Sequence, residues 1–151
     1  GRLDENDRSE FGTNVIPLQL SREALREGYL SVMQKLYDPE GYFNRLESLF
    51  IEGRFRFGQA RAKYWKEHCW VGRFEQARFG ILAFGLLARM MWTIPQRSLR
   101  KEYRKRIFRL LRVNRDPSVL FVYVIKCAMH YHHYTLATNM SSQRSAVVNT
   151  F

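Results

Sequence analysis

The chain has 151 residues, 46% of them hydrophobic and 15% aromatic, and it carries a formal net charge of +11 at pH 7. This length suits one domain, and the hydrophobic fraction is high enough for a buried core, which excludes a disordered tail. The apolar run at residues 79–88 is bracketed by Arg78 and Arg89. A helix needs about 20 apolar residues to cross a bilayer, so we expect no transmembrane segment.

The charge is distributed unevenly along the chain. Residues 1–53 contain six basic and ten acidic side chains, whereas residues 54–151 contain nineteen basic and four acidic ones. Such asymmetry indicates a positive surface that faces phosphates, an acidic partner domain or a membrane. Charge alone leaves these three alternatives open.

The first 20 residues are predicted to form a linker and an extended arm. Residues 1–12 are polar, and Pro17 interrupts the short apolar stretch at 13–18, which is expected to pack on another surface. A helical domain should follow at 21–140, and residues 141–151 should form a flexible tail. Because the chain starts without a methionine and ends on this soft run, we expect it to be a segment of a longer protein.

Two helices are predicted after the arm. Ser21 is a suitable N-cap for the first, and Asp38 followed by Pro39 is a start signal for the second, which should end at Gly53. The first has apolar residues at helical spacing: Leu25, Tyr29, Val32, Met33 and Leu36. The second repeats this pattern with Tyr42, Phe43, Leu46, Leu49 and Phe50.

Two further helices are predicted before residue 93. The pattern at 54–70 suits a helix with a half-exposed aromatic edge formed by Trp65 and Trp70. Residues 73–92 are apolar on nearly every side after Phe79, which predicts a buried central helix.

The last two predicted helices differ in character. The one after Pro95 is amphipathic, with nine Lys or Arg residues and one acid between Gln96 and Arg115. Its apolar side contains Leu99, Tyr103, Ile107, Leu110 and Leu111. The other begins at Asp116 and Pro117 and is too long for a strand despite its β-branched start. The fold class is therefore all-α, an irregular bundle of about five or six helices with an extended N-terminal arm.

The basic helix is the first candidate binding surface. Its predicted basic face consists of Arg97, Arg100, Lys101, Arg104, Lys105 and Arg112. Amphipathic spacing favours a solvated or interdomain role for these cations. Phosphate contacts with nucleic acid need a similar density of positive charge and are the less favoured alternative, followed by contact with a membrane surface.

The segment from His130 to Tyr134 contains three histidines, but it does not form a metal motif. Successive helical residues point about 100° apart, so His130, His132 and His133 cannot all face one metal ion. No carboxylate or cysteine stands at a matching spacing. Hydrogen-bonded or partly exposed histidines are favoured, and a ligand-facing role for one of them stays open.

No catalytic motif is present. The sequence lacks GxSxG, HExxH and a glycine-rich phosphate loop, and Cys69 and Cys127 lie far apart, outside any zinc spacing. Two reduced thiols are typical of a cytoplasmic protein. The acids are interpreted as scattered residues of polar faces: Glu47, Glu52, Glu67 and Glu75.

An ordered set of residues between 13 and 46 carries a family resemblance. The set consists of Thr13-Asn14-Val15-Ile16-Pro17, Ser21-Arg22-Glu23 with Leu25, Gly28-Tyr29, Leu36-Tyr37-Asp38-Pro39-Glu40 and Tyr42-Phe43. It resembles the C-terminal domain of unknown function in cobalamin-binding radical S-adenosylmethionine proteins, the group that includes hopanoid methylases. A second, shorter match is Tyr131-His132.

The resemblance implies a parent enzyme in which this helical region follows a radical barrel. The parent would use a four-iron four-sulfur cluster, S-adenosylmethionine and cobalamin, whereas this fragment, which lacks CxxxCxxC, would hold no cofactor. It further implies that a few residues face the barrel or its substrate: Thr13, Asn14, Ile16, Pro17 and His132. Leu18 and Gln19 depart from the family, which often has a basic residue after the proline.

The favoured function is therefore a non-catalytic accessory domain that packs on the upstream barrel and helps to shape its substrate side. The alternative is an independent basic helical module that binds RNA or another phosphate-rich partner.

Overall fold

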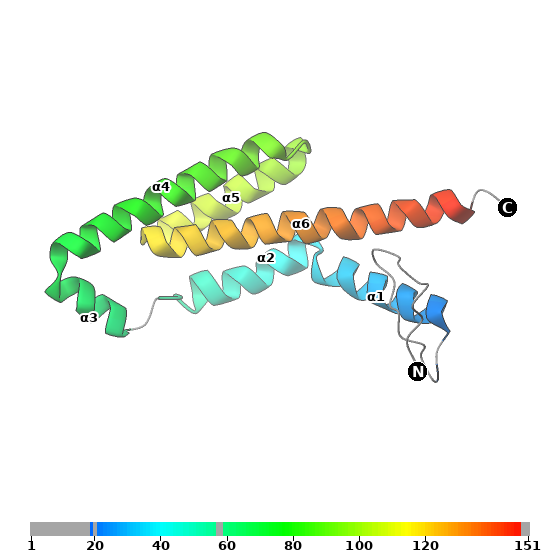
Figure 1. The fold of residues 1–151 in the computed structure, drawn as a ribbon, viewed down its shortest axis with the longest axis horizontal. Coiled ribbons are helices and arrows are strands. Elements are labelled where there is room, and N and C mark those ends of the chain that lie inside the picture. Colours follow the sequence, from blue (N-terminus) through cyan, green and yellow to red (C-terminus); the bar gives the residue numbers. More distant parts are fainter. Residues whose placement is uncertain (1–18, 20, 57–58, 149–151) are drawn as a thin grey trace, which may run out of the picture. The chain divides into compact units, whose positions relative to one another are not determined.

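The computed structural model describes residue 19 and residues 21–56 and 59–148 (Figure 1). These residues form six α-helices and one π-helical turn, and they contain no strand, which confirms the predicted all-α class. Of the predicted arm at 1–20, only residue 19 lies within the described residues. The elements are α1 (Arg22–Leu36), α2 (Pro39–Glu47), η1 (Ser48–Glu52), α3 (Gln59–Glu67), α4 (Cys69–Thr93), α5 (Arg97–Val113) and α6 (Pro117–Val148).

The chain divides into two compact units. The central unit comprises Tyr42–His130, and the terminal unit comprises Gly1–Gly41 together with Tyr131–Phe151. α6 continues to Val148 and so extends past residue 141, where the predicted tail begins. Residues 141–148 contain neither proline nor glycine, so no local signal ends the helix at residue 140.

The predicted helix starts are confirmed by their caps. The Ser21 Oγ accepts a hydrogen bond of 3.1 Å from the Ala24 amide at the start of α1. At the start of α2, the Asp38 carboxylate accepts one of 2.9 Å from the Gly41 amide. Asp116 does the same for the Ser118 amide at the start of α6, also at 2.9 Å. Each side chain satisfies an amide that the first helical turn leaves without an intrahelical partner.

The core of the central unit is aromatic. Phe43 of α2 packs edge-on against Tyr103 of α5, with ring centroids 5.5 Å apart. Phe50 of η1 packs in the same way against Tyr123 of α6, at 5.4 Å. All four rings are almost completely buried. The apolar side predicted for α5 is buried as well, except that Leu111 is half-buried.

α4 is not the buried central helix that its composition predicts. Ala83 and Met90 are buried, but the opposite side of the helix carries several large, exposed apolar side chains. α3 covers the beginning of α4, where Arg61 lies over the Phe79 ring at 5.0 Å. The prediction failed because apolar residues on all sides of a helix do not determine how many of those sides other helices cover.

In the terminal unit, the apolar face predicted for α1 is largely exposed. Met33 is buried, whereas Tyr29, Val32 and Leu36 are about half exposed. The ring of Tyr37, which follows α1, stacks on His133 of α6 with centroids 4.5 Å apart.

Candidate functional site

A buried histidine lies at the centre of a group of aromatic rings in the central unit. A hydrogen bond of 2.7 Å joins the Tyr103 Oη to the His130 Nδ1, and neither side chain is exposed. The rings of Tyr42 and Phe43 lie 4.6 and 5.1 Å from the His130 ring. The Tyr42 hydroxyl in turn donates to the carbonyl of Lys126 at 3.0 Å. His130 therefore has a structural hydrogen bond and no route to solvent.

The other two histidines of the segment have different surroundings. His132 is exposed and meets His133 edge-on at 5.2 Å, while His133 is half-buried against Tyr37. In the described part of the chain, no group of three or more His, Cys, Asp or Glu side chains could hold a metal ion. A substrate-facing role for His132 stays a prediction. Thr13, Asn14, Ile16 and Pro17 lie outside the described residues.

A network of ion pairs, which we call the paired flank, joins α2 to α5. The Glu47 carboxylate accepts hydrogen bonds from Arg106 at 2.8 Å and from Arg109 at 2.7 Å. Arg106 also donates to Glu102 at 2.6 Å. Burial by itself lowers the pKa of Arg106, but the hydrogen bonds to Glu47 and Glu102 raise it above its ordinary value. The guanidinium is therefore charged at every physiological pH.

The interpretation of Glu47 as a residue of a polar face is wrong, because its side chain is only 12% exposed. The helical spacing of α2 could have predicted that the Glu47 side chain is buried. Glu47 follows the buried Phe43 by four residues, so both lie on one side of α2. An acid on the core side of a helix needs a cationic partner, and α5 provides two.

Two further buried groups in the central unit are polar and lie on α6. The Tyr123 hydroxyl is fully buried and has no hydrogen-bond partner among the described residues. Burial raises the pKa of Tyr123 and that of the Cys127 thiol above their ordinary values. Cys127 is therefore protonated and inert, whereas Cys69 is exposed.

The predicted basic face of α5 is exposed, except that Arg100 is half-buried. The structure divides this face into two parts. Met91 of α4 and three of the predicted residues, Arg97, Arg100 and Arg104, line a pocket of about 330 Å³ that we call the arginine pocket. The remaining predicted residues, Lys101, Lys105 and Arg112, do not line it. A hydrogen bond of 3.4 Å from Arg100 to the carbonyl of Met91 holds Arg100 against the end of α4.

A second hollow, of about 510 Å³, lies in the terminal unit. Tyr37 and Asp38 line one part of it, and Tyr134 and Thr138 line another. His132 is not among its lining residues. The Asp38 carboxylate is already the cap of α2.

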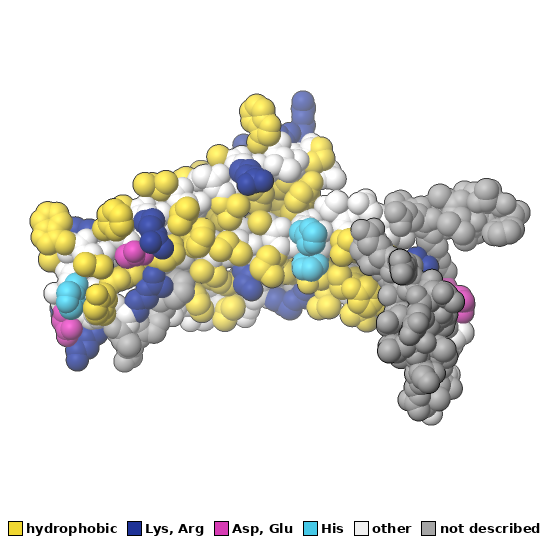
Figure 2. Space-filling model, in the orientation of Figure 1, with side chains coloured by type: hydrophobic (Ala, Val, Ile, Leu, Met, Phe, Trp, Pro, Cys, Tyr) yellow, Lys and Arg dark blue, Asp and Glu magenta, His cyan; other side chains and the backbone are white. Residues whose placement is uncertain are grey.

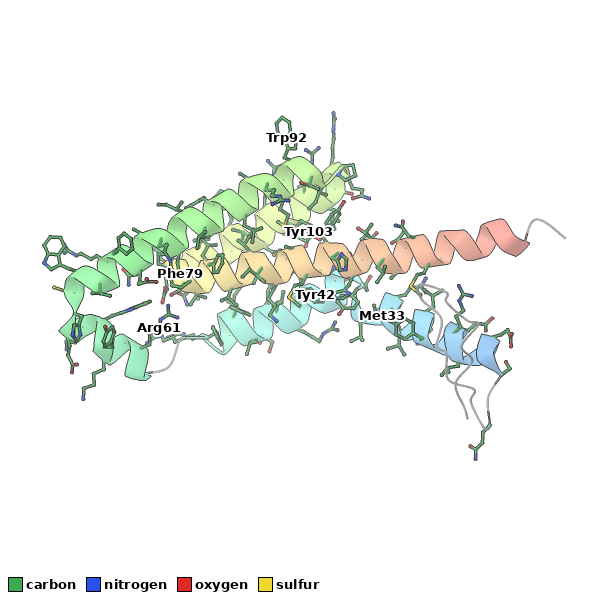
Figure 3. All side chains as sticks on the ribbon, viewed as in Figure 1. Met33, Tyr42, Arg61, Phe79, Trp92 and Tyr103 are labelled. Carbon is green, nitrogen blue, oxygen red and sulfur yellow. The ribbon has the colours of Figure 1, made fainter. Side chains whose placement is uncertain are left out.

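The five most exposed apolar residues of α4 form one row, which we call the α4 outer face. Its members are Trp70 (80% exposed), Phe74 (69%), Ile81 (73%), Phe84 (61%) and Trp92 (92%). At 100° per residue, these positions lie within about 80° of one another around the helix axis. Figure 2 shows hydrophobic side chains gathered on this surface, and Figure 3 shows Trp92 projecting away from its helix.

These features define a helical-bundle domain whose buried polar groups are mostly paired with one another and which has an uncovered apolar face. The chain belongs to the DUF4070 family, a domain of unknown function, whose family model matches residues 1–146. No curated protein and no solved structure matches the chain. None of the described helices combines the length and the apolar character that a membrane span requires.

Proposed function

We propose that this domain is a non-catalytic accessory part of a cytoplasmic, cobalamin-dependent radical S-adenosylmethionine enzyme. In this proposal the domain packs on the upstream barrel and helps to shape its substrate side. Membership of a family of domains of unknown function supports the role of a part within a larger protein. The identity of the parent rests on the resemblance of residues 13–46 and of Tyr131-His132.

The α4 outer face is the observation that carries the proposal. Moving one large apolar side chain from water into a protein interface is favourable by about 1.5–3 kcal/mol. A row of five such side chains along one helix is more than scattered surface residues require, and rows of this kind are typical of interaction sites. The barrel, as the neighbouring domain, is the partner that we propose for this face.

The paired polar groups support an accessory role. His130 is hydrogen-bonded to Tyr103, and Glu47 accepts hydrogen bonds from two arginines, so these groups stabilise the bundle. The chain has two cysteines, fewer than the three that CxxxCxxC requires, and Cys127 is buried and protonated. The residues present do not fit an iron–sulfur cluster. We therefore assign the cluster, S-adenosylmethionine and cobalamin to other domains of the parent.

The test introduces charge on the α4 outer face of the full-length parent. Ile81→Asp combined with Phe84→Asp should reduce the parent's activity and expose the domain to limited proteolysis. The matched control is Val32→Asp with Leu36→Asp, because these α1 residues are also exposed and apolar. If the control has the same effect, or if the α4 variant is fully active and resists proteolysis, α4 is not the docking face.

The basic face supports the second candidate function, an independent module that binds RNA. Phosphate-driven binding weakens steeply as the salt concentration rises. A gel shift with single-stranded RNA that disappears between low and physiological salt would favour this module, provided that the α4 variant binds as the unmodified protein does. Absence of a shift at low salt would eliminate it.

A further inference from the structure

The arginine pocket combines three cations of α5 on one side of the helix. Arg97, Arg100 and Arg104 are separated by three and four residues, so their side chains are neighbours. Arg100 is the most buried of the three and is hydrogen-bonded to the carbonyl of Met91. Arg97 and Arg104 flank it, one turn away on either side, and all three line the same pocket.

The charges of this pocket have no counterpart in the described part of the chain. None of the three guanidinium groups forms an ion pair with a described acid, whereas Arg106 and Arg109 on the same helix share Glu47. Arginine stays charged at any physiological pH, so proton loss cannot relieve the repulsion. Like charges at this spacing destabilise a helix, and a bound anion would remove that cost.

The donor set indicates the chemical class of the anion. A guanidinium group presents a planar fork of N–H donors that fits two oxygens of a carboxylate or a phosphate. Three guanidinium groups offer more N–H donors than the two oxygens of one carboxylate can accept. A phosphate monoester has three terminal oxygens and a charge of about −1.5 to −2 at pH 7. We propose that the arginine pocket is a binding site for a phosphate monoester group.

The size and surroundings of the pocket agree with such a ligand. Its volume of about 330 Å³ is near the lower end of small-molecule sites, which span roughly 300–1,000 Å³. Lys101, Lys105 and Arg112 lie on the same helix but do not line the pocket, so dissolved salt screens their effect on a bound anion. The phosphate group can belong to a free metabolite or to the headgroup of a lipid, and the experiment separates these two sources.

The experiment measures binding of two probes to the full-length protein at fixed salt. Inorganic phosphate is titrated by calorimetry, and vesicles of phosphatidylcholine with and without phosphatidic acid are tested by co-sedimentation. The pocket variant is R97Q/R100Q/R104Q, and the matched control is K101Q/K105Q/R112Q, which removes the same charge from the same helix. Because charge-assisted hydrogen bonds are lost, the pocket variant should bind about tenfold more weakly or worse, whereas the control should bind nearly normally.

A second variant and a pH series keep the test independent of folding. R97K/R100K/R104K keeps the charge but loses the forks, so it should weaken binding while leaving the circular dichroism spectrum unchanged. The second pKa of a phosphate monoester is near 6, so the affinity for phosphatidic acid, which carries such a group, should fall between about pH 7 and pH 5 as the ligand gains a proton. Sulfate, which keeps its charge over this range, should not show this fall.

Saturable binding of free phosphate that the pocket variant loses supports a metabolite as the source. Binding confined to phosphatidic acid vesicles, lost in the same variant, supports a lipid headgroup. The proposal is overturned if neither probe binds, if the control loses as much affinity as the pocket variant, or if only RNA binds. None of these results depends on whether the α4 outer face contacts a barrel, because the two surfaces are changed separately.

Discussion

The paired flank and the arginine pocket are two regions of α5 with the same residue type in opposite circumstances. In the paired flank, Arg106 and Arg109 share the Glu47 carboxylate, Arg106 also pairs with Glu102, and the Arg106 side chain is only 11% exposed. In the arginine pocket, three guanidinium groups line a hollow and have no described carboxylate partner. The arginines of α5 thus form ion pairs with α2 in one region and line a pocket without a described carboxylate partner in the other.

The difference follows from burial. A charge removed from water costs several kcal/mol unless a partner compensates it, so the buried Arg106 requires Glu47. An exposed guanidinium is solvated and needs no partner, and Arg97 and Arg104 are exposed. Stability therefore explains the paired flank, but it does not explain why three cations gather around one pocket.

The largest effect is expected when the paired flank is broken at Glu47. Glu47→Gln leaves the nearly buried Arg106 with Glu102 alone and deprives Arg109 of its partner. Removing one partner of a buried pair costs about 3–5 kcal/mol, and we expect about 3 kcal/mol here because Glu102 remains. The free energy of unfolding from urea titration measures this loss.

The control for this substitution is Glu52→Gln. Glu52 is an exposed acid of η1, and its replacement should change the unfolding free energy by less than about 0.5 kcal/mol. Equal losses in the two variants would mean that Glu47 does not hold α5 and that the two regions of the helix are energetically alike.

The same contrast between paired and unpaired groups exists inside the core, between two buried tyrosines. Tyr103→Phe removes the hydrogen-bond partner of the buried His130 Nδ1 and should destabilise the protein by about 1–3 kcal/mol. Tyr123→Phe removes a hydroxyl that has no described partner, so it should be neutral or stabilising. Thermal unfolding of the two variants measures the difference, and a larger loss for Tyr123→Phe would contradict it.

Much of the fold was predictable because its signals are local. The caps at Ser21, Asp38 and Asp116 each act within four residues of the helix start, and the 3.6-residue spacing of α5 identifies both its buried and its basic sides. The outward direction of the cations of α5 follows from the same spacing.

The features that the sequence did not predict depend on contacts between distant parts of the chain. Glu47 is 59 residues away from Arg106, and Tyr103 is 27 residues away from His130. Periodicity gives the direction of each side chain but not its partner. The exposure of α4 was missed for the same reason, since its apolar pattern is equally compatible with a covered and an uncovered outer side. The arginine pocket needs Met91 of α4 as a wall, which no pattern within α5 reveals.

The pH dependence of the unfolding free energy distinguishes the contribution of the buried Cys127 thiol from that of the paired flank. Burial raises the pKa of Cys127, so the folded protein keeps a proton that the unfolded chain releases above about pH 8.5. Stability should therefore be fully present below that pH and fall by about 1.4 kcal/mol per pH unit above it. Arg106 cannot cause this fall, because an arginine keeps its proton in both the folded and the unfolded chain over this pH range.

Urea unfolding of the unmodified protein and of Cys127→Ala between pH 8 and pH 10 provides the measurement. The variant lacks the thiol, so its slope should be smaller by about 1.4 kcal/mol per pH unit over the upper half of this range. Parallel slopes would show that the thiol is accessible in the folded protein and that the fall arises elsewhere.

The smallest effects come from single arginines on the two regions of α5, and they should have opposite signs. Arg109 is 59% exposed and paired with Glu47, so Arg109→Gln removes an attraction worth about 0.5 kcal/mol. Arg104 lies among like charges, so Arg104→Gln removes a repulsion and should stabilise the protein by about 0.2–0.5 kcal/mol. At roughly 1 M salt the Debye length is about 3 Å, so both differences should shrink toward zero. Thermal unfolding in low and high salt measures them.

If Arg104→Gln destabilises the protein at low salt without added phosphate, its guanidinium already has a favourable partner within the protein. The arginine pocket would then be a second paired region, with no excess charge to offer a ligand.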